Sequence, residues 1–382
     1  MSGFPTKANW AAGDVLTAAQ MDDLAGTVNY LSPVGQANGS TLVADSSTST
    51  GLRYQGSAIG KNAVFNSGYD VFQRTTAPTT GITVTGNILY TLDRWMSWTQ
   101  SGGGSCITSQ QATGDTTNLP FVRYCARFRR ATSNTDTGTL VFGQSLENTD
   151  SARFIGQTVC FSFYARKGAN YSATSNLLNA TLYSNTTTDA GLNTVISGAA
   201  GPISINATLT STWQRFQGTA TVSATATQLA VGFNFTPTGT ALAADYFEVT
   251  GVQLELGSVA TPFAKMGAGT IQSELAACQR YYYNVGVGTN KPLGISINDS
   301  TTITYVDVYA PVTMRTAPTI VQTTGASYYL IAGANQTGFT GIDQTTNTIT
   351  ELYLSTSALV IGQARLSRSQ NASGSISLSA EL

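Results

Sequence analysis

The sequence predicts a mainly β protein built from antiparallel β-sandwiches. Residues that favour strands (Thr, Val, Tyr and Phe) are plentiful, and 38 glycines with many Asn and Ser residues supply turns. In segment 246–256, successive side chains point to alternate faces, and one of the two faces is more apolar than the other, as expected of a half-buried strand. Similar short segments recur between turn residues, and 382 residues are enough for two or three domains.

The N-terminal segment 1–34 is predicted to contain one helix. Thr17 is a suitable N-cap, Gln20 completes a capping box, and Pro33 ends the helix. A single short helix buries its apolar face only by docking on another surface. We expect it to anchor the chain in a larger assembly, although packing on its own domain is the alternative. The predicted anchoring residues are Trp10, Leu16, Met21, Leu24, Val28 and Leu31.

The central part of the chain is predicted to be a two-sheet sandwich over residues 62–266, preceded by a Gly/Ser/Thr-rich spacer at 35–61. Gly257 and Pro262 end its last strand, in which strict alternation places Glu248 and Glu255 on opposite faces. The predicted strands are 64–65, 69–74, 82–85, 90–98, 121–128, 140–147, 157–167, 180–184, 213–222, 228–235 and 246–256.

Residues 267–382 are predicted to form a short helix followed by a smaller β-sandwich. Thr270 is the expected helix cap. The predicted strands are 293–297, 302–310, 319–323, 328–331, 348–354, 359–367 and 374–379. If the domains are arranged linearly, this sandwich is the domain farthest from the N-terminal anchor.

Charge and composition exclude several classes of function. The chain has 19 Lys and Arg, 20 Asp and Glu, and no His. The near-zero net charge argues against a nucleic-acid partner, and the lack of His removes His-based catalysis and zinc ligation. No apolar run approaches the roughly 20 residues that span a membrane. Cys106, Cys125, Cys160 and Cys278 form no Cys-x-x-Cys pair, so we expect buried free thiols.

Several short motifs occur in a characteristic order along the chain. They are Phe72-Gln73-Arg74, Leu92-Asp93-Arg94-Trp95, segment 156–167, Thr212-Trp213-Gln214-Arg215, segments 252–263 and 274–282, and Ser379-Ala380-Glu381-Leu382. Together they resemble a family of bacteriophage tail-fibre and other virion proteins. The middle domain is similar to the carbohydrate-binding jelly rolls found beside glycoside hydrolases.

The resemblance implies a non-enzymatic virion protein, assembled in the host cytoplasm. It implies a homotrimeric tail fibre or receptor-binding subunit that joins other virion proteins through its N-terminus and a host surface glycan through its distal β domain. No cofactor is implied. A structural calcium ion is typical of the resembled jelly rolls, but no Asp-x-Asp-x-Asp-Gly loop is present, so the metal content stays open. The alternatives are a head-fibre, decoration or collar component and a polysaccharide-depolymerising spike.

Aromatic side chains are the candidate carbohydrate contacts, because sugars stack their apolar faces on aromatic rings. The candidates are Trp98, Tyr305, Tyr328, Tyr329 and Tyr353, whereas Trp95 and Trp213 are expected in the core. Among the carboxylates, Asp93 is expected to pair with an Arg inside the fold. Asp299 and Asp307, or Asp136 and Glu147, are pairs that could meet in space, although no motif marks them.

Overall fold

The computed structural model describes residues 41–44, 52–55, 61–86, 88–100 and 104–382. The chain divides into two compact units, 1–57 and 58–382. In the first unit, strands β1 (Thr41–Ala44) and β2 (Leu52–Gln55) pair in antiparallel fashion within the predicted spacer. The predicted anchor helix lies outside the described residues, so the anchor remains a prediction, as do the predicted domain boundaries.

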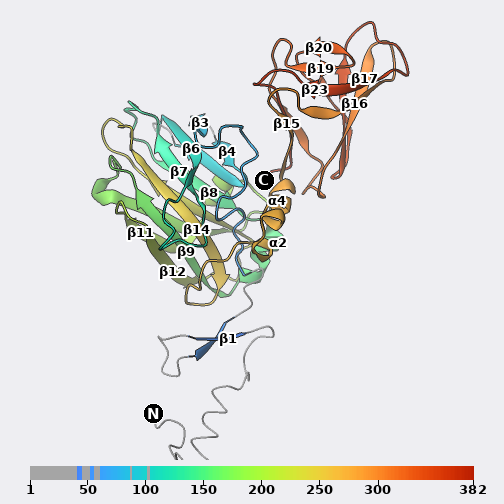
Figure 1. The fold of residues 1–382 in the computed structure, drawn as a ribbon. Coiled ribbons are helices and arrows are strands. Elements are labelled where there is room, and N and C mark those ends of the chain that lie inside the picture. The colour runs from blue at the N-terminus through green and yellow to red at the C-terminus, as the bar shows by residue number, and fades with distance from the viewer. Residues whose placement is uncertain (1–40, 45–51, 56–60, 87, 101–103) are drawn as a thin grey trace, which may run out of the picture. The chain divides into compact units, whose positions relative to one another are not determined.

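Two six-stranded antiparallel sheets form the central sandwich (Figure 1). The first sheet has the order β11 (Ala200–Thr208), β10 (Leu177–Asn185), β13 (Gln228–Phe235), β8 (Leu140–Ser145), β5 (Trp95–Thr99) and β4 (Ile88–Leu92). The second has the order β12 (Gln214–Thr221), β9 (Thr158–Lys167), β14 (Tyr246–Leu256), β7 (Tyr124–Arg130), β6 (Ser105–Ala112) and β3 (Ile82–Thr85). The predicted jelly-roll-like sandwich is therefore confirmed.

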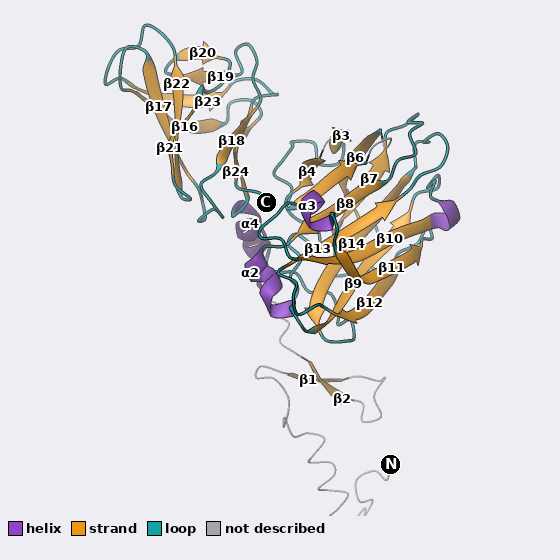
Figure 2. Cartoon of the chain, turned by 180° about the vertical axis from the view of Figure 1, so that it is seen from behind, coloured by secondary structure: helices purple, strands orange, loops and turns teal. Residues whose placement is uncertain are grey.

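Helices are few and short in the central sandwich (Figure 2). They are α2 (Asn148–Ser151), α3 (Leu192–Ile196) and the 3₁₀ turns η1 (Ala152–Phe154) and η2 (Thr174–Asn176). An aromatic cluster fills the space between the sheets. Trp95 is fully buried there, stacks on Phe142 at 4.9 Å between ring centroids, and donates its Nε1–H to the carbonyl of Phe65. All four cysteines are free and buried, as predicted.

The predicted strands at 64–65 and 69–74 are wrong, because side-chain amides bind this backbone in place of a strand ladder. Asn62 Oδ1 accepts from the N–H groups of Val64 and Leu254, and Asn66 binds both backbone polar groups of Val71. Asn66 and Tyr69 both have positive φ. Segment 61–74 is thus a buried, irregular connection whose polar groups are satisfied locally.

Three other sequence predictions are corrected in the same sandwich. The single strand expected at 90–98 is a hairpin, with Arg94 in the left-handed region (φ 71°) between β4 and β5. The strand expected from Phe121 begins at Tyr124, and Phe121 is 76% exposed. Strands β6 and β11 were not predicted, because their sequences are rich in Ser, Thr, Gln and Ala.

Strand β14 is confirmed, but it is buried on both faces and contains a bulge. The register shifts between Thr250 and Gln253, where Gly251 has a φ of 57°. The bulge inverts the alternation, so that core residues occur at 247 and 249 before it and at 252 and 254 after it. Glu248 and Glu255 therefore share the outer face, contrary to the prediction, and each is held by its own hydrogen bonds.

The C-terminal part is a second, smaller sandwich, as predicted. A three-stranded sheet has the order β15 (Tyr282–Val287), β24 (Ser375–Ser379) and β18 (Thr319–Gln322). A seven-stranded sheet has the order β20 (Ala334–Gln336), β19 (Tyr329–Ile331), β23 (Ala364–Ser369), β16 (Pro292–Asn298), β17 (Ile303–Tyr309), β22 (Ile349–Ser355) and β21 (Gly341–Thr345). Side chains from both sheets form one separate core. The strand expected at 359–367 begins later, at Ala364, and leaves 359–363 as a loop.

Helix α4 (Ile271–Gln279) follows the turn η3 (Gly267–Gly269) and precedes the second sandwich. Thr270 caps it as predicted, by accepting from the N–H of Ser273. The helix packs on the first sandwich: the Glu274 carboxylate accepts from the N–H of Asn66, and Tyr281 belongs to the first core. Residue 266 is thus followed by chain that still contributes to the jelly-roll core.

Residues at the end of the second sandwich also bind the first. The Glu381 carboxylate forms ion pairs with Arg74 and Arg94, and the Arg94 guanidinium lies 3.6 Å from the ring centroid of Tyr281. Asp93 is buried, as expected, but Gln73 holds its carboxylate through two hydrogen bonds, and no described Arg pairs with it.

Candidate binding site on the seven-stranded sheet

Strand alternation gives the seven-stranded sheet one buried and one exposed face. In β17 and β22 the inward residues include Val306, Val308 and Leu352, which belong to the second core. The residues between them point to the opposite side. That side exposes large apolar residues, from 39% to 64% of each: Ile295, Ile297, Tyr309, Ile349 and Leu366. Large apolar side chains gathered on one exposed sheet face are typical of a contact site.

The hydrogen-bond register brings residues from neighbouring strands into rows across this exposed face. Tyr305 lies opposite Ile297 on one side and opposite Tyr353 on the other. In the next row, Asp307 lies opposite Glu351. Directly opposed residues have Cβ atoms about 4.5–5.5 Å apart. Aromatic, aliphatic and acidic side chains therefore share one surface.

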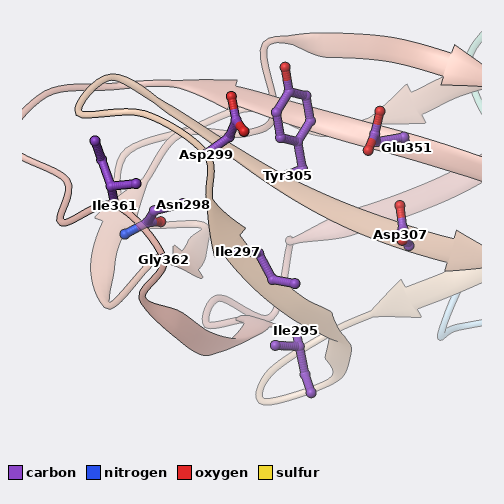
Figure 3. Close-up of a pocket in the computed structure, with 9 residues that line it drawn as sticks. All are labelled: Ile295, Ile297, Asn298, Asp299, Tyr305, Asp307, Glu351, Ile361 and Gly362. Atoms are coloured by element: carbon purple, nitrogen blue, oxygen red, sulfur yellow. The ribbon is translucent and has the colours of Figure 1, made fainter.

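A hollow of about 410 Å³ opens on this face (Figure 3). In the figure, the ring of Tyr305 stands between the carboxylates of Asp299 and Glu351. The hollow is lined by Ile295, Ile297, Asn298, Asp299, Tyr305, Asp307, Glu351, Ile361 and Gly362. It therefore combines an aromatic and aliphatic surface with carboxylate groups, from β16, β17, β22, the turn between β16 and β17, and the loop before β23.

Asn298 fixes the loop that forms one wall of the hollow. Its backbone carbonyl accepts from the N–H of Gly362, its own N–H donates to Gln363, and its side-chain Nδ2 donates to the carbonyl of Val360 at 3.0 Å. A carbonyl only accepts, so this bond sets the orientation of the amide. The other amide atom, Oδ1, is buried and has no partner among the described residues. The side chain lies on the buried side of β16, because Asn298 alternates with the exposed Ile297.

The acidic side chains at the hollow influence one another. Burial, followed by the carboxylates of Asp307 and Asp343, raises the pKa of Glu351 above its ordinary value. Desolvation, followed by the carboxylates of Asp343 and Asp299, raises the pKa of Tyr305. None of the four carboxylates forms an ion pair within the described part of the chain. The hollow is therefore a region of negative potential.

A second hollow, of about 210 Å³, shares Asp307 and Glu351 with the first. It is lined by Asp307, Gln344, Thr345, Thr346, Ile349 and Glu351. The two shared carboxylates therefore border two neighbouring hollows, which suits a ligand longer than one ring.

The structure brings two of the predicted tyrosines together. Tyr305 lines the first hollow, and Tyr353 is its half-buried cross-strand neighbour. The Tyr353 ring lies over Gly341, where a Cβ atom would stand 3.1 Å from the ring. Glycine at that position gives the ring room to lie on the sheet. The binding role of both tyrosines remains a prediction.

The other predicted aromatic residues lie elsewhere. Tyr329 is fully buried in the second core, and its hydroxyl donates to the carbonyls of Thr323 and Ser375, so its position does not fit a sugar platform. Tyr328 is half-buried and packs against the same core. Trp98 is half-buried in β5 of the first sandwich. None of the three lines the hollow.

Trp213 does not lie in the core as expected. It is half-buried, donates its Nε1–H to the carbonyl of Thr113, and stacks under the Arg166 guanidinium at 4.6 Å. The loop that contains Thr113 thus contacts this tryptophan, and the arginine covers one ring face. These contacts leave Trp213 a structural role on the outer side of β12.

Sequence reasoning missed the residues that complete the hollow. Asn298, Glu351, Ile361 and Gly362 carry no motif, and their convergence depends on strand register and on the loop before β23. Asp299 and Asp307 were noted as carboxylates able to meet, and both line this hollow. The available signal was the run of outward Ile and Tyr residues at alternate positions, which a half-exposed strand does not need.

Within the described residues, no group of three or more Cys, Asp or Glu side chains is arranged to hold a metal ion. No helix in the described part of the chain is long and apolar enough to cross a membrane.

Comparisons with known proteins give structural neighbours only. No protein-family model and no curated protein matches the chain. A carbohydrate-binding module of the CBM4 type is 18% identical, over 50% of this chain and 98% of its own, with a TM-score of 0.30. TmCBM61, solved with beta-1,4-galactotriose, is 9% identical over 51% of this chain and 99% of its own, with a TM-score of 0.27.

A phage protein is also among these neighbours. The enzymatically active domain of bacteriophage CBA120 tailspike protein 4 is 12% identical, over 52% of this chain and 22% of that chain, with a TM-score of 0.30. At these identities and TM-scores the alignments carry no functional argument. Function is therefore argued from the residues of this chain.

Proposed function

We propose that this chain is a non-enzymatic glycan-binding protein, and that the hollow around Tyr305 on the exposed face of the seven-stranded sheet is its contact site. The observation that carries the proposal is the hollow in which Tyr305 and Ile297 lie in rows next to the carboxylates of Asp307 and Glu351. A sugar ring offers apolar C–H groups on one face and hydroxyl donors at its edge. Both kinds of group have counterparts here.

The energetics of the empty face favour this kind of ligand. Covering the exposed side chains of Ile295 and Ile297 with a ligand is favourable, by roughly 25 cal/mol for each Å² of apolar surface that is removed from water. The accessible carboxylates of Asp299, Asp307 and Glu351 accept hydrogen bonds from the hydroxyls of a sugar. A ligand that covers the apolar side chains and donates to these carboxylates therefore suits the hollow.

We place this activity in a bacteriophage virion, on the strength of the sequence resemblance. The chain would be a homotrimeric tail fibre or receptor-binding subunit, with residues 1–34 joined to other virion proteins. Three copies of one weak glycan site on a particle raise the effective affinity by avidity, without new contacts.

The glycan proposal is tested with Tyr305→Ala in the full chain. Its matched control is Tyr309→Ala, since Tyr309 lies on the same strand and face, is 64% exposed, and lines neither hollow. On a glycan array and by calorimetry with the best-binding glycan, we expect Tyr305→Ala to weaken binding about fivefold or more, and Tyr309→Ala to change it less than about twofold. Equal effects, or no glycan binding by the native chain, would refute the proposal.

The same surface has a competing explanation as a contact between subunits, because exposed Ile and Leu side chains also suit protein interfaces. Light scattering of the native chain and of Ile297→Ala separates the two. If the face binds glycan, Ile297→Ala keeps the native mass and loses affinity. If the variant changes the oligomeric mass, the face is an interface between copies.

The non-enzymatic part of the proposal is tested with the same glycan. Prolonged incubation with the native chain should release no reducing sugar. Sugar release that disappears in Asp307→Asn would show hydrolysis and place the chain among depolymerising spikes.

The proposal that the chain belongs to a virion is tested by deleting residues 1–32, which should abolish its incorporation into the particle. If the shortened chain is still incorporated, the anchor lies elsewhere.

A further inference from the structure

The polar groups of the hollow are almost all acceptors. Its charged lining consists of Asp299, Asp307 and Glu351, and no Lys or Arg is among its described lining residues. The Asn298 amide is buried and donates to the carbonyl of Val360. Among the exposed and half-buried lining side chains, the Tyr305 hydroxyl is the group that both donates and accepts. A ligand that suits this hollow must therefore be rich in donors.

The negative charge of the hollow further limits the classes of ligand that it can bind. Three carboxylates line it, and Asp343 lies close enough to Glu351 to raise its pKa. The like charges disfavour one another, and no described cation pairs with them. An anionic ligand would add to this repulsion, whereas a cationic group would relieve it.

We propose that the hollow selects a sugar with a free amino group, a hexosamine unit whose ammonium lies against Asp307 and Glu351. This inference rests on the proposed function and specifies its ligand class. An ammonium group has three donors and no acceptor, and its hydrogen bonds to carboxylates are charge-assisted. The sugar ring covers Ile297 and Tyr305, as in the general proposal.

Selectivity arises from the acidic side of the hollow and affinity from its apolar side. The carboxylates are accessible to water, so salt screens the attraction and each ion pair contributes modestly. Uronic acid, sulfated or sialylated sugars meet repulsion at the same positions. The expected order of affinity is amino sugar, then neutral sugar, then acidic sugar.

A matched pair of ligands tests this inference directly. The β-1,4-linked tetramers of glucosamine and of N-acetylglucosamine have the same backbone, and only the first carries ammonium groups. By calorimetry with the full chain at low salt, we expect the glucosamine tetramer to bind about fivefold or more tighter, and this preference to shrink as salt is added. Equal affinity, or a preference for the acetylated tetramer, would overturn the inference.

Two variants assign the preference to the hollow. Asp307→Asn and Glu351→Gln keep side-chain size and remove one charge each, and each should reduce the preference for glucosamine about threefold. Asp136→Asn, an exposed carboxylate of the first sandwich, is the control and should leave the preference unchanged. If the control lowers the preference as much as the two variants do, the effect is one of net charge and the inference fails.

The outcomes also separate this inference from the general proposal. If neutral glycans bind and Tyr305→Ala weakens them, while the two charge variants have no effect, the glycan site stands and the amino-sugar preference is wrong. If neither tetramer nor any array glycan binds the native chain, both fail together. If only the glucosamine tetramer binds, and Tyr305→Ala abolishes it, both stand.

Discussion

The two sandwiches of this chain treat their scarce charges in opposite ways. In the first, charged side chains form ion pairs: Arg130 with Asp245, Glu248 with both Arg127 and Arg166, and Arg74 and Arg94 with Glu381 from the chain end after β24. In the second, four carboxylates gather on an open sheet face with no described cation beside them. Paired, buried charges hold a scaffold in one arrangement, whereas clustered, unpaired charges at a hollow indicate a ligand.

The largest effect on stability is expected when the buried Arg130–Asp245 ion pair of the first sandwich is broken. Arg130→Met leaves the fully buried Asp245 carboxylate without its counter-charge, although Ser172 still donates to it. We expect a loss of about 3–5 kcal/mol in the free energy of unfolding, measured with denaturant. A loss below about 1 kcal/mol would mean that this buried pair does not hold the first sandwich together.

The second effect is a pH dependence at Glu274, whose carboxylate is buried under helix α4. Burial raises its pKa from 4.5 to about 7. Between these values the folded protein binds more protons than the unfolded chain, so stability falls as pH rises through this window, by roughly 3 kcal/mol in total.

Glu274→Gln tests this pH dependence, because it keeps an acceptor for the N–H of Asn66 and removes the titration. We expect the free energy of unfolding of the variant, measured at pH 5 and pH 8, to increase relative to that of the native chain as the pH rises. A constant difference between the two proteins would contradict the buried, titrating carboxylate.

The third effect compares one chemical change in both regions. Glu381→Gln removes the counter-charge of Arg74 and Arg94 and should cost about 2 kcal/mol of stability. Glu351→Gln makes the same change in the acidic cluster, where it should alter stability by less than about 0.5 kcal/mol. Denaturant unfolding of both variants measures the contrast, and similar losses would remove the distinction between scaffold and site.

The smallest effect is expected at the tip of the loop before β23. Ile361 is 64% exposed and lines the hollow, so Ile361→Ala should leave stability nearly unchanged and weaken glycan binding about twofold. Val321→Ala, an exposed aliphatic on the other sheet, is the matched control. Calorimetry with the glucosamine tetramer measures both, and equal effects would show that this loop does not touch the ligand.

Much of the fold could be predicted from the sequence, because period-two alternation and turn residues are local signals. The strands at 228–235 and 246–256 and the cap at Thr270 were found in this way. The failures have local causes that a pattern conceals. Asn62 and Asn66 replace a ladder with side-chain bonds, and Gly251 inverts the alternation of β14 through a bulge.

The site was harder to predict than the fold. Tyr305 could be proposed from its type and position, but its neighbours come from three strands and two loops whose arrangement no local pattern reveals. The loop with Ile361 and Gly362 is held by hydrogen bonds to Asn298, which only the folded backbone provides. Convergence of this kind is a property of topology rather than of sequence periodicity.

The most direct measurement is a crystal structure of the full chain soaked with the glucosamine tetramer. We expect a sugar ring against Ile297 and Tyr305 and an ammonium within hydrogen-bond distance of Asp307 or Glu351. A tetramer seated on the first sandwich, or an empty hollow at saturating ligand, would contradict the assignment of binding to the seven-stranded sheet.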